Sequence, residues 1–322
     1  MSSKLCRFNK GFSLVDLLIV IAIVGILAAV LLPSLRINRD GGSRRTACLN
    51  NIRNISLACV SYEMTNQQFP AAVSSHSESF LVRILPMLDQ NPLYDDFRSE
   101  PDKNLAIEIL AGVEIEIFRC AAAAHNDFAS SDTGFTSHYT GSAGPASSNT
   151  LDKYGSAEFS YQTNNFGPVG LRGLFSPTII DGADPSNAVA RKTKSGVIAE
   201  HVSDGLSNTL AIVETSRSDF FNNGGRTFTN RRPRWSWGLE EAEPTKVNWS
   251  RSIARTINSF DDVPHQEIPY HELPISSNHL GGANVSSGDG STHFVSEDTD
   301  LIVLQAVGGI DEGDKEHQNL YQ

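Results

Sequence analysis

Near the end of the chain, a histidine and several aspartates have the residue types of a metal site. Nine residues separate His279 from Asp289-Gly290, and Asp298 and Asp300 follow. Imidazole nitrogen and carboxylate oxygen both bind metals, although a single histidine beside a turn also serves as a structural hydrogen-bonding group. The three aspartates offer the hard oxygen atoms that calcium prefers. Asp-Gly is also a hairpin-turn signal. We therefore predict a structural β-hairpin that needs no cofactor, with a calcium site as the alternative.

Elsewhere the chain lacks the common catalytic motifs. It has no P-loop, no Gly-x-Ser-x-Gly and no Cys-x-x-Cys, and His271-Glu272 lacks the second histidine of a zinc protease. Trp235, Trp237 and Trp249 lie in an arginine-rich stretch. Exposed tryptophans would suit glycan binding, but packing in a core is the favoured interpretation. We expect that the protein is not an enzyme.

One carboxylate interrupts a long apolar segment near the N-terminus. Residues 12–32 include a single charged residue, Asp16. As a helix, this segment would reach about 31 Å, enough to cross the hydrocarbon core of a bilayer. An aspartate within a membrane helix costs roughly 2.5–3.5 kcal/mol at the helix centre and less near an end. Asp16 is therefore predicted to be functional and to need a partner.

The residues around Asp16 resemble a known processing signal. The sequence KGFSLVDLLIV, residues 10–20, is similar to the cleavage site of type IV pilin-like prepilins, also called pseudopilins. The resemblance implies that a prepilin peptidase cuts between Gly11 and Phe12 and then methylates the amine of Phe12. Asp16 replaces the family's glutamate, which is thought to meet the N-terminal amine of a neighbouring subunit during assembly.

The rest of the chain resembles one prepilin subfamily. Residues 44–58 and the His279-x9-Asp289-Gly290 motif are similar to members that join a prepilin leader to a large domain of unknown function. The chain departs from this subfamily at Gly41-Gly42, where an unbroken helix is usual. It also has Cys120-Ala121 in place of Cys-Pro.

Three cysteines remain once the leader, which contains Cys6, is removed. Cys48 and Cys59 share one helical face but lie about 16 Å apart along the axis, too far for a disulfide. Burial of both as small apolar residues is the favoured interpretation. The alternative is a Cys48–Cys120 disulfide, which an oxidising compartment would allow.

Hydrophobic periodicity predicts the elements that position these residues. Residues 45–63 have an amphipathic helical pattern, preceded by a break near residues 40–43. Residues 115–120 alternate like a strand, and a turn leads into a strand at 210–213. Residues 127–195 are rich in small polar residues and indicate long surface loops. The apolar stripe of the helix consists of Cys48, Ile52, Ile55, Cys59 and Tyr62.

We expect an α+β fold with a long N-terminal membrane-spanning helix and a head that contains an antiparallel sheet and long loops. The predicted divisions are a leader (1–11), a transmembrane and stalk helix (12–63) and an extracytoplasmic domain (64–322). The net charge of −11 gives no basic surface for nucleic acid. Loss of the leader's three cationic side chains would lower it to −14.

The resemblance implies a structural subunit of a type II secretion or type IV pilus-like assembly. Its expected partners are the prepilin peptidase, other pilin-like subunits and membrane lipid. It would pass once through the inner membrane, with its C-terminal domain outside the cytoplasm. The alternative is a membrane-tethered module that binds a glycan, a solute or a metal.

Overall fold

The structure is a computed structural model of the 322-residue chain. The structure describes residues 14–35, 42–73, 76–123, 134–147, 149, 153, 160–163, 167–176, 196–216, 235–237, 239–240, 243–247, 250–259 and 270–310. The chain divides into two units, Met1–Ser43 and Arg44–Gln322, and each is described by itself.

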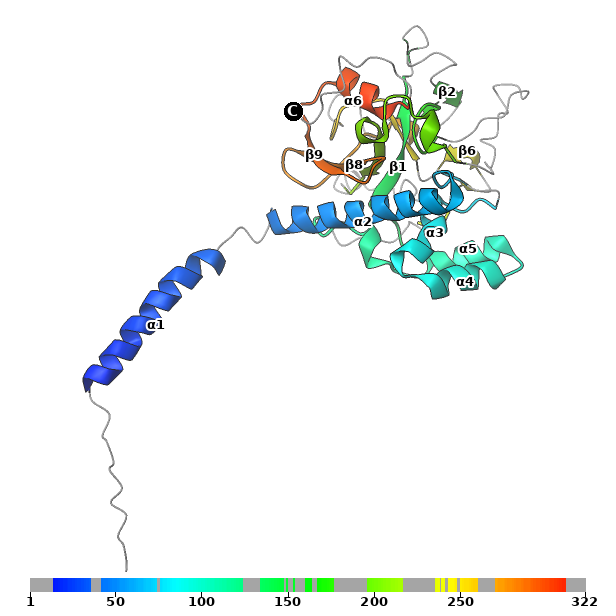
Figure 1. The fold of residues 1–322 in the computed structure, drawn as a ribbon. Coiled ribbons are helices and arrows are strands. Elements are labelled where there is room, and N and C mark those ends of the chain that lie inside the picture. The colour runs from blue at the N-terminus through cyan, green and yellow to red at the C-terminus, as the bar shows by residue number, and fades with distance from the viewer. Residues whose placement is uncertain are drawn as a thin grey trace, which may run out of the picture. The chain divides into compact units, whose positions relative to one another are not determined.

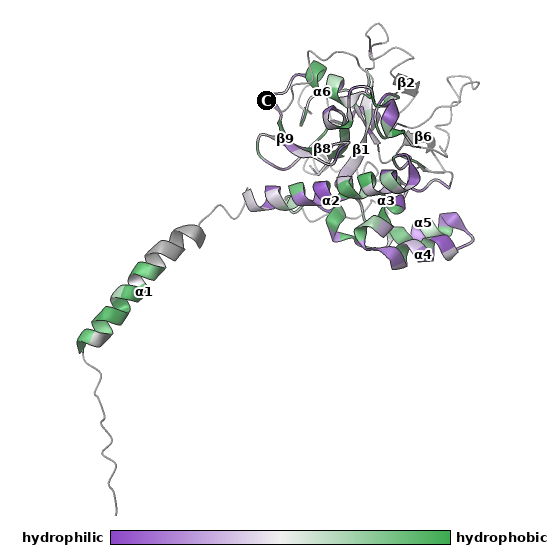
Figure 2. Ribbon diagram, in the orientation of Figure 1, coloured by the Kyte–Doolittle hydropathy of each residue, from purple (hydrophilic) through white to green (hydrophobic). Residues whose placement is uncertain are grey.

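The first unit contains helix α1, Leu14–Leu35. Its described side chains are exposed, from Leu14 (74% exposed) to Leu27 (56%). They are also largely hydrophobic, as the green colour of α1 in Figure 2 shows. Asp16 belongs to the first turn of this helix, whereas Gly11 and Phe12 lie outside the described residues. Within the described part of the chain, no helix meets the combined length and hydropathy required of a membrane span. The predicted helix is present, and its membrane-spanning role stays a prediction.

Helix α2, Gly42–Asn66, carries the predicted apolar stripe. Cys48, Ile52, Ile55 and Cys59 are buried, because their spacing of three and four residues places them on one face. Of the predicted break at residues 40–43, residues 40 and 41 lie outside the described part, and Gly42 and Ser43 form the start of α2. Gly42 lies at a helix end, where glycine is better tolerated than in a helix interior.

Short helices follow α2 along the chain. They are α3 (Phe80–Arg83), the 3-10 turn η1 (Leu85–Leu88), α4 (Asn91–Ser99), α5 (Lys103–Ala111) and η2 (Glu116–Phe118). Asp102 caps α5 by accepting hydrogen bonds from the N–H groups of Asn104 and Leu105. The prediction of a strand at residues 115–120 was wrong. The backbone there closes local turns, with the Phe118 N–H donating to the Ile115 carbonyl at 3.0 Å.

The main sheet has five strands in the order β7-β1-β4-β8-β9. The strands are β1 (Tyr139–Pro145), β4 (Leu210–Glu214), β7 (Ser250–Ile253), β8 (Gly282–Ser287) and β9 (Thr292–Ser296). The expected antiparallel sheet is in fact mixed, because β7 pairs with β1 in parallel while the other neighbours are antiparallel. The long connection between β1 and β7 lets the chain re-enter the sheet in the same direction.

Smaller elements complete the head. They are the pairs β2 (Ser160–Thr163) with β3 (Gly167–Gly170) and β5 (Leu239–Glu240) with β6 (Glu243–Val247), the 3-10 turns η4 (Ala199–His201), η5 (Leu206–Asn208) and η8 (Tyr270–Glu272), and helix α6 (Leu301–Gly308). The expected α+β class is confirmed.

Helices cover both faces of the sheet. In Figure 1, α2 lies between the strands and the helices α3–α5, and α6 lies beyond the strands. Ile52 and Ile55 of α2 belong to one buried cluster with Tyr139 of β1. Leu304 of α6 belongs to a second cluster, which includes Val285 of β8. The site described below therefore lies beside a packed core.

Residues 127–195 were predicted to form long surface loops with short strands at most, but strand β1 lies within them and is buried along its whole length. Its sequence, YTGSAGP, has few large apolar side chains. A Cβ on Gly141 would lie only 2.5 Å from the Cβ of Phe175. The strand uses small residues because neighbouring segments approach its backbone closely.

The predicted hairpin at Asp289-Gly290 is confirmed by the pairing of β8 with β9. The Ser287 N–H donates to the Ser291 carbonyl at 2.9 Å, and Gly290 has φ +88°. A Cβ on Gly282 would lie 2.0 Å from the Val295 carbonyl oxygen, so a side chain there would collide with β9.

Candidate functional site

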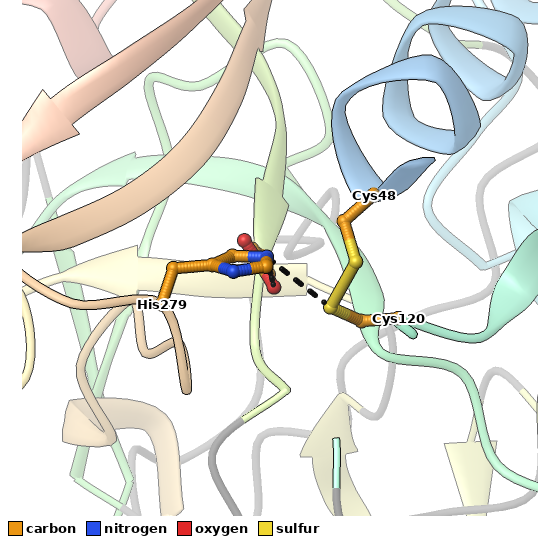
Figure 3. Close-up of side chains that lie close together, drawn as sticks. Cys48, Cys120 and His279 are labelled. Atoms are coloured by element: carbon orange, nitrogen blue, oxygen red, sulfur yellow. Dashed lines mark hydrogen bonds and ion pairs between the residues drawn. A yellow bond between two sulfur atoms is a disulfide. The ribbon is translucent and has the colours of Figure 1, made fainter. Parts of the chain in front are cut away.

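Four potential ligand side chains gather in the head. The ligand atoms of Cys48, Cys120, Glu214 and His279 all lie within 4.8 Å of one another, and all four residues are buried. Cys48 comes from α2, Cys120 follows η2, Glu214 ends β4 and His279 precedes β8. Figure 3 shows the His279 ring directed toward the Cys48–Cys120 bridge. The fold therefore brings these four residues, which are far apart in the sequence, close together in space.

Cys48 and Cys120 form a disulfide, with their Cα atoms 5.0 Å apart. Neighbouring side chains hold the backbone of both residues in place. The Cys120 N–H donates to Nδ1 of His138 at 2.8 Å, and the Tyr139 hydroxyl donates to the Cys48 carbonyl at 3.3 Å. Cys59 stays outside this group as a buried thiol, and burial raises its pKa. The structure therefore contains the pairing that the sequence left as an alternative.

Glu214 is fully buried and held by several donors. Its Oε1 accepts a hydrogen bond from the Ser216 hydroxyl at 2.6 Å. Its Oε2 accepts from the backbone N–H and the side-chain amide of Asn284, at 3.0 and 2.9 Å. Burial raises the pKa of Glu214, and these hydrogen bonds offset part of that effect by stabilising the anion.

The Nε2 atom of His279 faces two members of the group. It lies 3.4 Å from Sγ of Cys120 and 3.5 Å from Oε1 of Glu214. Burial, and to a lesser extent the positive charge of Arg45, lower the pKa of His279 to about 4. The imidazole is therefore neutral near pH 7, and its contact with Glu214 is not an ion pair there. The Ser277 hydroxyl accepts from the His279 N–H at 3.0 Å and fixes the backbone.

A cavity of about 570 Å³ lies beside His279. Asn258 and Glu297 form part of its wall and are joined by a hydrogen bond of 3.0 Å from Nδ2 to Oε2. Its lining residues are Thr256, Ile257, Asn258, Ser259, Ser277, Asn278, His279, Leu280, Gly281 and Glu297. This largely polar wall would suit a small polar molecule.

The structure does not bring together the aspartates proposed for calcium. Asp289 lies in the β8–β9 turn, where its Oδ1 accepts hydrogen bonds from the N–H and the hydroxyl of Ser291. Asp298 and Asp300 follow the far end of β9, so the length of that strand separates them from Asp289. His279 lies three residues before β8 begins, at the end of the strand opposite to the turn, and its ring faces Glu214 instead. The structure therefore does not support the alternative interpretation in which His279 and Asp289 bind one metal ion.

The tryptophans of the arginine-rich stretch serve the core where the structure describes them. Trp235 is 1% exposed, packs with its ring tilted against Phe118 at a centroid distance of 5.3 Å, and donates from Nε1 to the Val113 carbonyl. Trp237 packs partly buried against the same core, and Trp249 lies outside the described residues. Trp235 is therefore not an exposed platform for a glycan.

The matched families account for most of the chain. Residues 42–301 match the family described as "Protein of unknown function (DUF1559)". The chain belongs to this family. Residues 6–32 match the prokaryotic N-terminal methylation motif, which confirms the type IV prepilin-like resemblance. No curated protein and no solved structure matches the chain. In this DUF1559 member, all four clustered residues lie within the family match.

Sequence reasoning missed Glu214 as a site residue. It follows the apolar strand residues 210–213, where a carboxylate ends a fully buried strand. A carboxylate directly after an apolar strand could have indicated a site, because a buried carboxylate requires hydrogen-bond donors or a cation. Its partners could not be named, since Asn284 and His279 approach it only through the pairing of β4 with β8.

Proposed function

We propose that the protein is a structural, non-enzymatic pilin-like subunit that a prepilin peptidase processes and that α1 anchors in the inner membrane. The methylation motif over residues 6–32 is the observation that carries this proposal. Cleavage between Gly11 and Phe12 would leave α1 close to the new N-terminus. The DUF1559 head would then lie outside the cytoplasm, where its disulfide is stable.

The exposed surface of α1 supports the anchoring role. Leu14, Ile19 and Ile26 are 74%, 53% and 65% exposed. Apolar side chains at this density are unfavourable in water and favourable among lipid tails or neighbouring apolar helices. A type II secretion or type IV pilus-like assembly would supply both environments.

Mass spectrometry of the membrane-extracted protein tests processing. Cells with an active prepilin peptidase should yield a chain that begins with N-methyl-Phe12. A bulky side chain in Gly11→Leu should block cleavage, whereas Gly11→Ala should only slow it. Normal processing of Gly11→Leu, or recovery of only the uncut wild-type chain, would contradict the proposal.

Asp16 tests assembly separately from processing. The amine of Phe12 stays cationic after methylation, and pairing with Asp16 would lower the cost of placing both charges in an apolar layer. Asp16→Asn should therefore be cleaved and inserted but enter filaments less, while Asp16→Glu should assemble as well as wild type. Cross-linking of subunit N-termini and the fraction sheared from cells measure this. An Asn variant that cross-links and shears like wild type would refute the assembly role.

The cavity beside His279 favours a second candidate, a membrane-tethered module that binds a small polar solute. Its wall carries the Asn258 amide and the Glu297 carboxylate. Such a protein would need the N-terminal segment only for export and anchoring. Shearing separates the two candidates, because filament subunits are released from cells by shear and tethered modules remain with the membrane.

A further inference from the structure

We propose that Cys48, Cys120, Glu214 and His279 form a redox-controlled site for a zinc-like divalent cation. The site takes the metal when the two cysteines are reduced and loses it when they form the disulfide. Two thiolates, one imidazole and one carboxylate match the ligands of tetrahedral zinc. This inference does not depend on the role in assembly.

Two ligand distances in the cluster match those of a tetrahedral zinc site, and all four ligand atoms lie within 4.8 Å of one another. Zinc lies about 2.3 Å from sulfur and about 2.0–2.2 Å from nitrogen or oxygen, which places a sulfur and a nitrogen ligand about 3.6 Å apart. The distance from Sγ of Cys120 to Nε2 of His279 is 3.4 Å. Nitrogen and oxygen ligands would lie about 3.4 Å apart, and Nε2 of His279 lies 3.5 Å from Oε1 of Glu214.

Reduction supplies an adjustment that the two sulfur ligands need. Two thiolates on one zinc ion lie about 3.8 Å apart, farther than two bonded sulfur atoms. Cleavage of the disulfide lets Sγ of Cys48 and Sγ of Cys120 separate by side-chain rotation. The Cα atoms, 5.0 Å apart, can remain in place on α2 and after η2.

The surroundings of Glu214 support a cationic ligand. Its Oε2 accepts from both Asn284 donors, and its Oε1, which also accepts from the Ser216 hydroxyl, lies toward His279. Donors of this kind commonly orient carboxylate ligands around metals. A carboxylate with no exposed surface carries a large desolvation cost, and a divalent cation would offset it more strongly than neutral donors do.

The redox chemistry balances with an external dithiol or phosphine as reductant. Cleavage of the Sγ–Sγ bond takes two electrons and two protons and leaves two thiols. Binding of the cation then releases both thiol protons, while the neutral imidazole donates its lone pair. A newly exported, still reduced chain would be in the form that binds metal. Oxidation by a disulfide-forming catalyst would remove two electrons and expel the ion.

Metal titration of the full-length chain in detergent micelles tests the proposal. The protein is measured as the disulfide and after phosphine reduction, with the reductant removed under anaerobic conditions. Zinc content by mass spectrometry should rise from none to one equivalent on reduction. Cobalt should then give the visible bands of a tetrahedral ion together with thiolate charge-transfer absorption.

Variants identify the ligands. Cys59→Ala removes a buried thiol outside the cluster and should leave cobalt binding unchanged. His279→Gln should weaken it by at least about 100-fold, and Asn284→Ala, which only releases Glu214, by about 10–100-fold. The proposal is overturned if the reduced wild type binds no cobalt, or if His279→Gln binds it as tightly as wild type. A reduced chain that unfolds and that zinc does not refold overturns it equally.

Discussion

Removal of the Cys48–Cys120 disulfide should strongly destabilise the head. The bridge joins residues 72 positions apart and closes a loop that contains α3, α4, α5 and η2. In the loop-entropy model, cross-linking a chain segment of this length stabilises the folded state by about 4 kcal/mol at 25 °C. The loop also ties α2 to the helices that cover it, so little of this effect should be lost to local rearrangement.

Urea unfolding followed by circular dichroism measures the effect on the full-length chain in detergent. The double variant Cys48→Ala/Cys120→Ala should lose about 3–4 kcal/mol of unfolding free energy relative to the oxidised wild type. EDTA in every sample removes any contribution from metal. Cys59→Ala is the matched control and should lose about 1 kcal/mol, because it shortens one buried side chain without opening a loop.

A loss of less than about 1 kcal/mol in the double variant would refute this reasoning. It would mean that α2 and the loop segment remain associated in the unfolded state, or that the bridge is strained enough to cancel its entropic benefit. Equal losses in the double variant and in Cys59→Ala would lead to the same conclusion.

Two further predictions concern pH and the hairpin. Burial and Arg45 lower the pKa of His279 from 6.5 to about 4 in the folded state. Between these two pH values the histidine is therefore protonated in the unfolded state and neutral in the folded state. Stability should fall by up to about 3 kcal/mol as the pH drops through this window. Urea titrations at several pH values should show a smaller fall in His279→Gln. They should show a steeper fall in Glu214→Gln. The raised pKa of Glu214 stabilises the folded state at low pH, and this stabilisation is lost as the pH rises through the folded-state pKa of Glu214. The Gln variant lacks this contribution, so nothing offsets the effect of His279. Gly290→Ala should cost about 1–2 kcal/mol, since Gly290 has φ +88° and its new Cβ would lie 2.8 Å from a methyl group of Leu57. Gly42→Ala meets nothing within 4 Å and should be neutral or stabilising in the same assay, so equal losses in the two variants would contradict this explanation.

Local patterns predicted the elements whose stability depends on neighbours in sequence. The stripe through Cys48, Ile52, Ile55 and Cys59 predicted α2 because helical spacing alone determines which residues share a face. Asp289-Gly290 predicted the hairpin because the turn needs a residue that tolerates positive φ.

Features that depend on distant segments escaped prediction. Strand β1 has the composition of a loop, and Gly141 is needed only because Phe175 packs against it. The parallel pairing of β1 with β7 depends on a connection of more than a hundred residues, whose path no local pattern records. Glu214 was missed for the same reason, since its partners come from other strands and loops.

The spacing between His279 and Asp289-Gly290 has a physical explanation in the packing of β8 on α2. At one end of β8, His279 contacts the bridge that begins at Cys48. At the other end, the Ser56 hydroxyl donates to the Ser287 carbonyl at 3.2 Å. Ser56 lies about 12 Å along the helix from Cys48, and β8 (Gly282–Ser287) extends about 16 Å, with residues 279–281 preceding the strand.

One end of β8 is therefore bonded to α2 directly at Ser287, and the segment before its other end is linked to α2 through His279 and the disulfide. An insertion within the strand would move either His279 away from the disulfide or the turn away from α2. A slip by one residue would also turn the buried Ala283 and Val285 to the opposite face. The motif thus sets a strand length, and Asp289 and His279 act at opposite ends of it rather than as partners at one site.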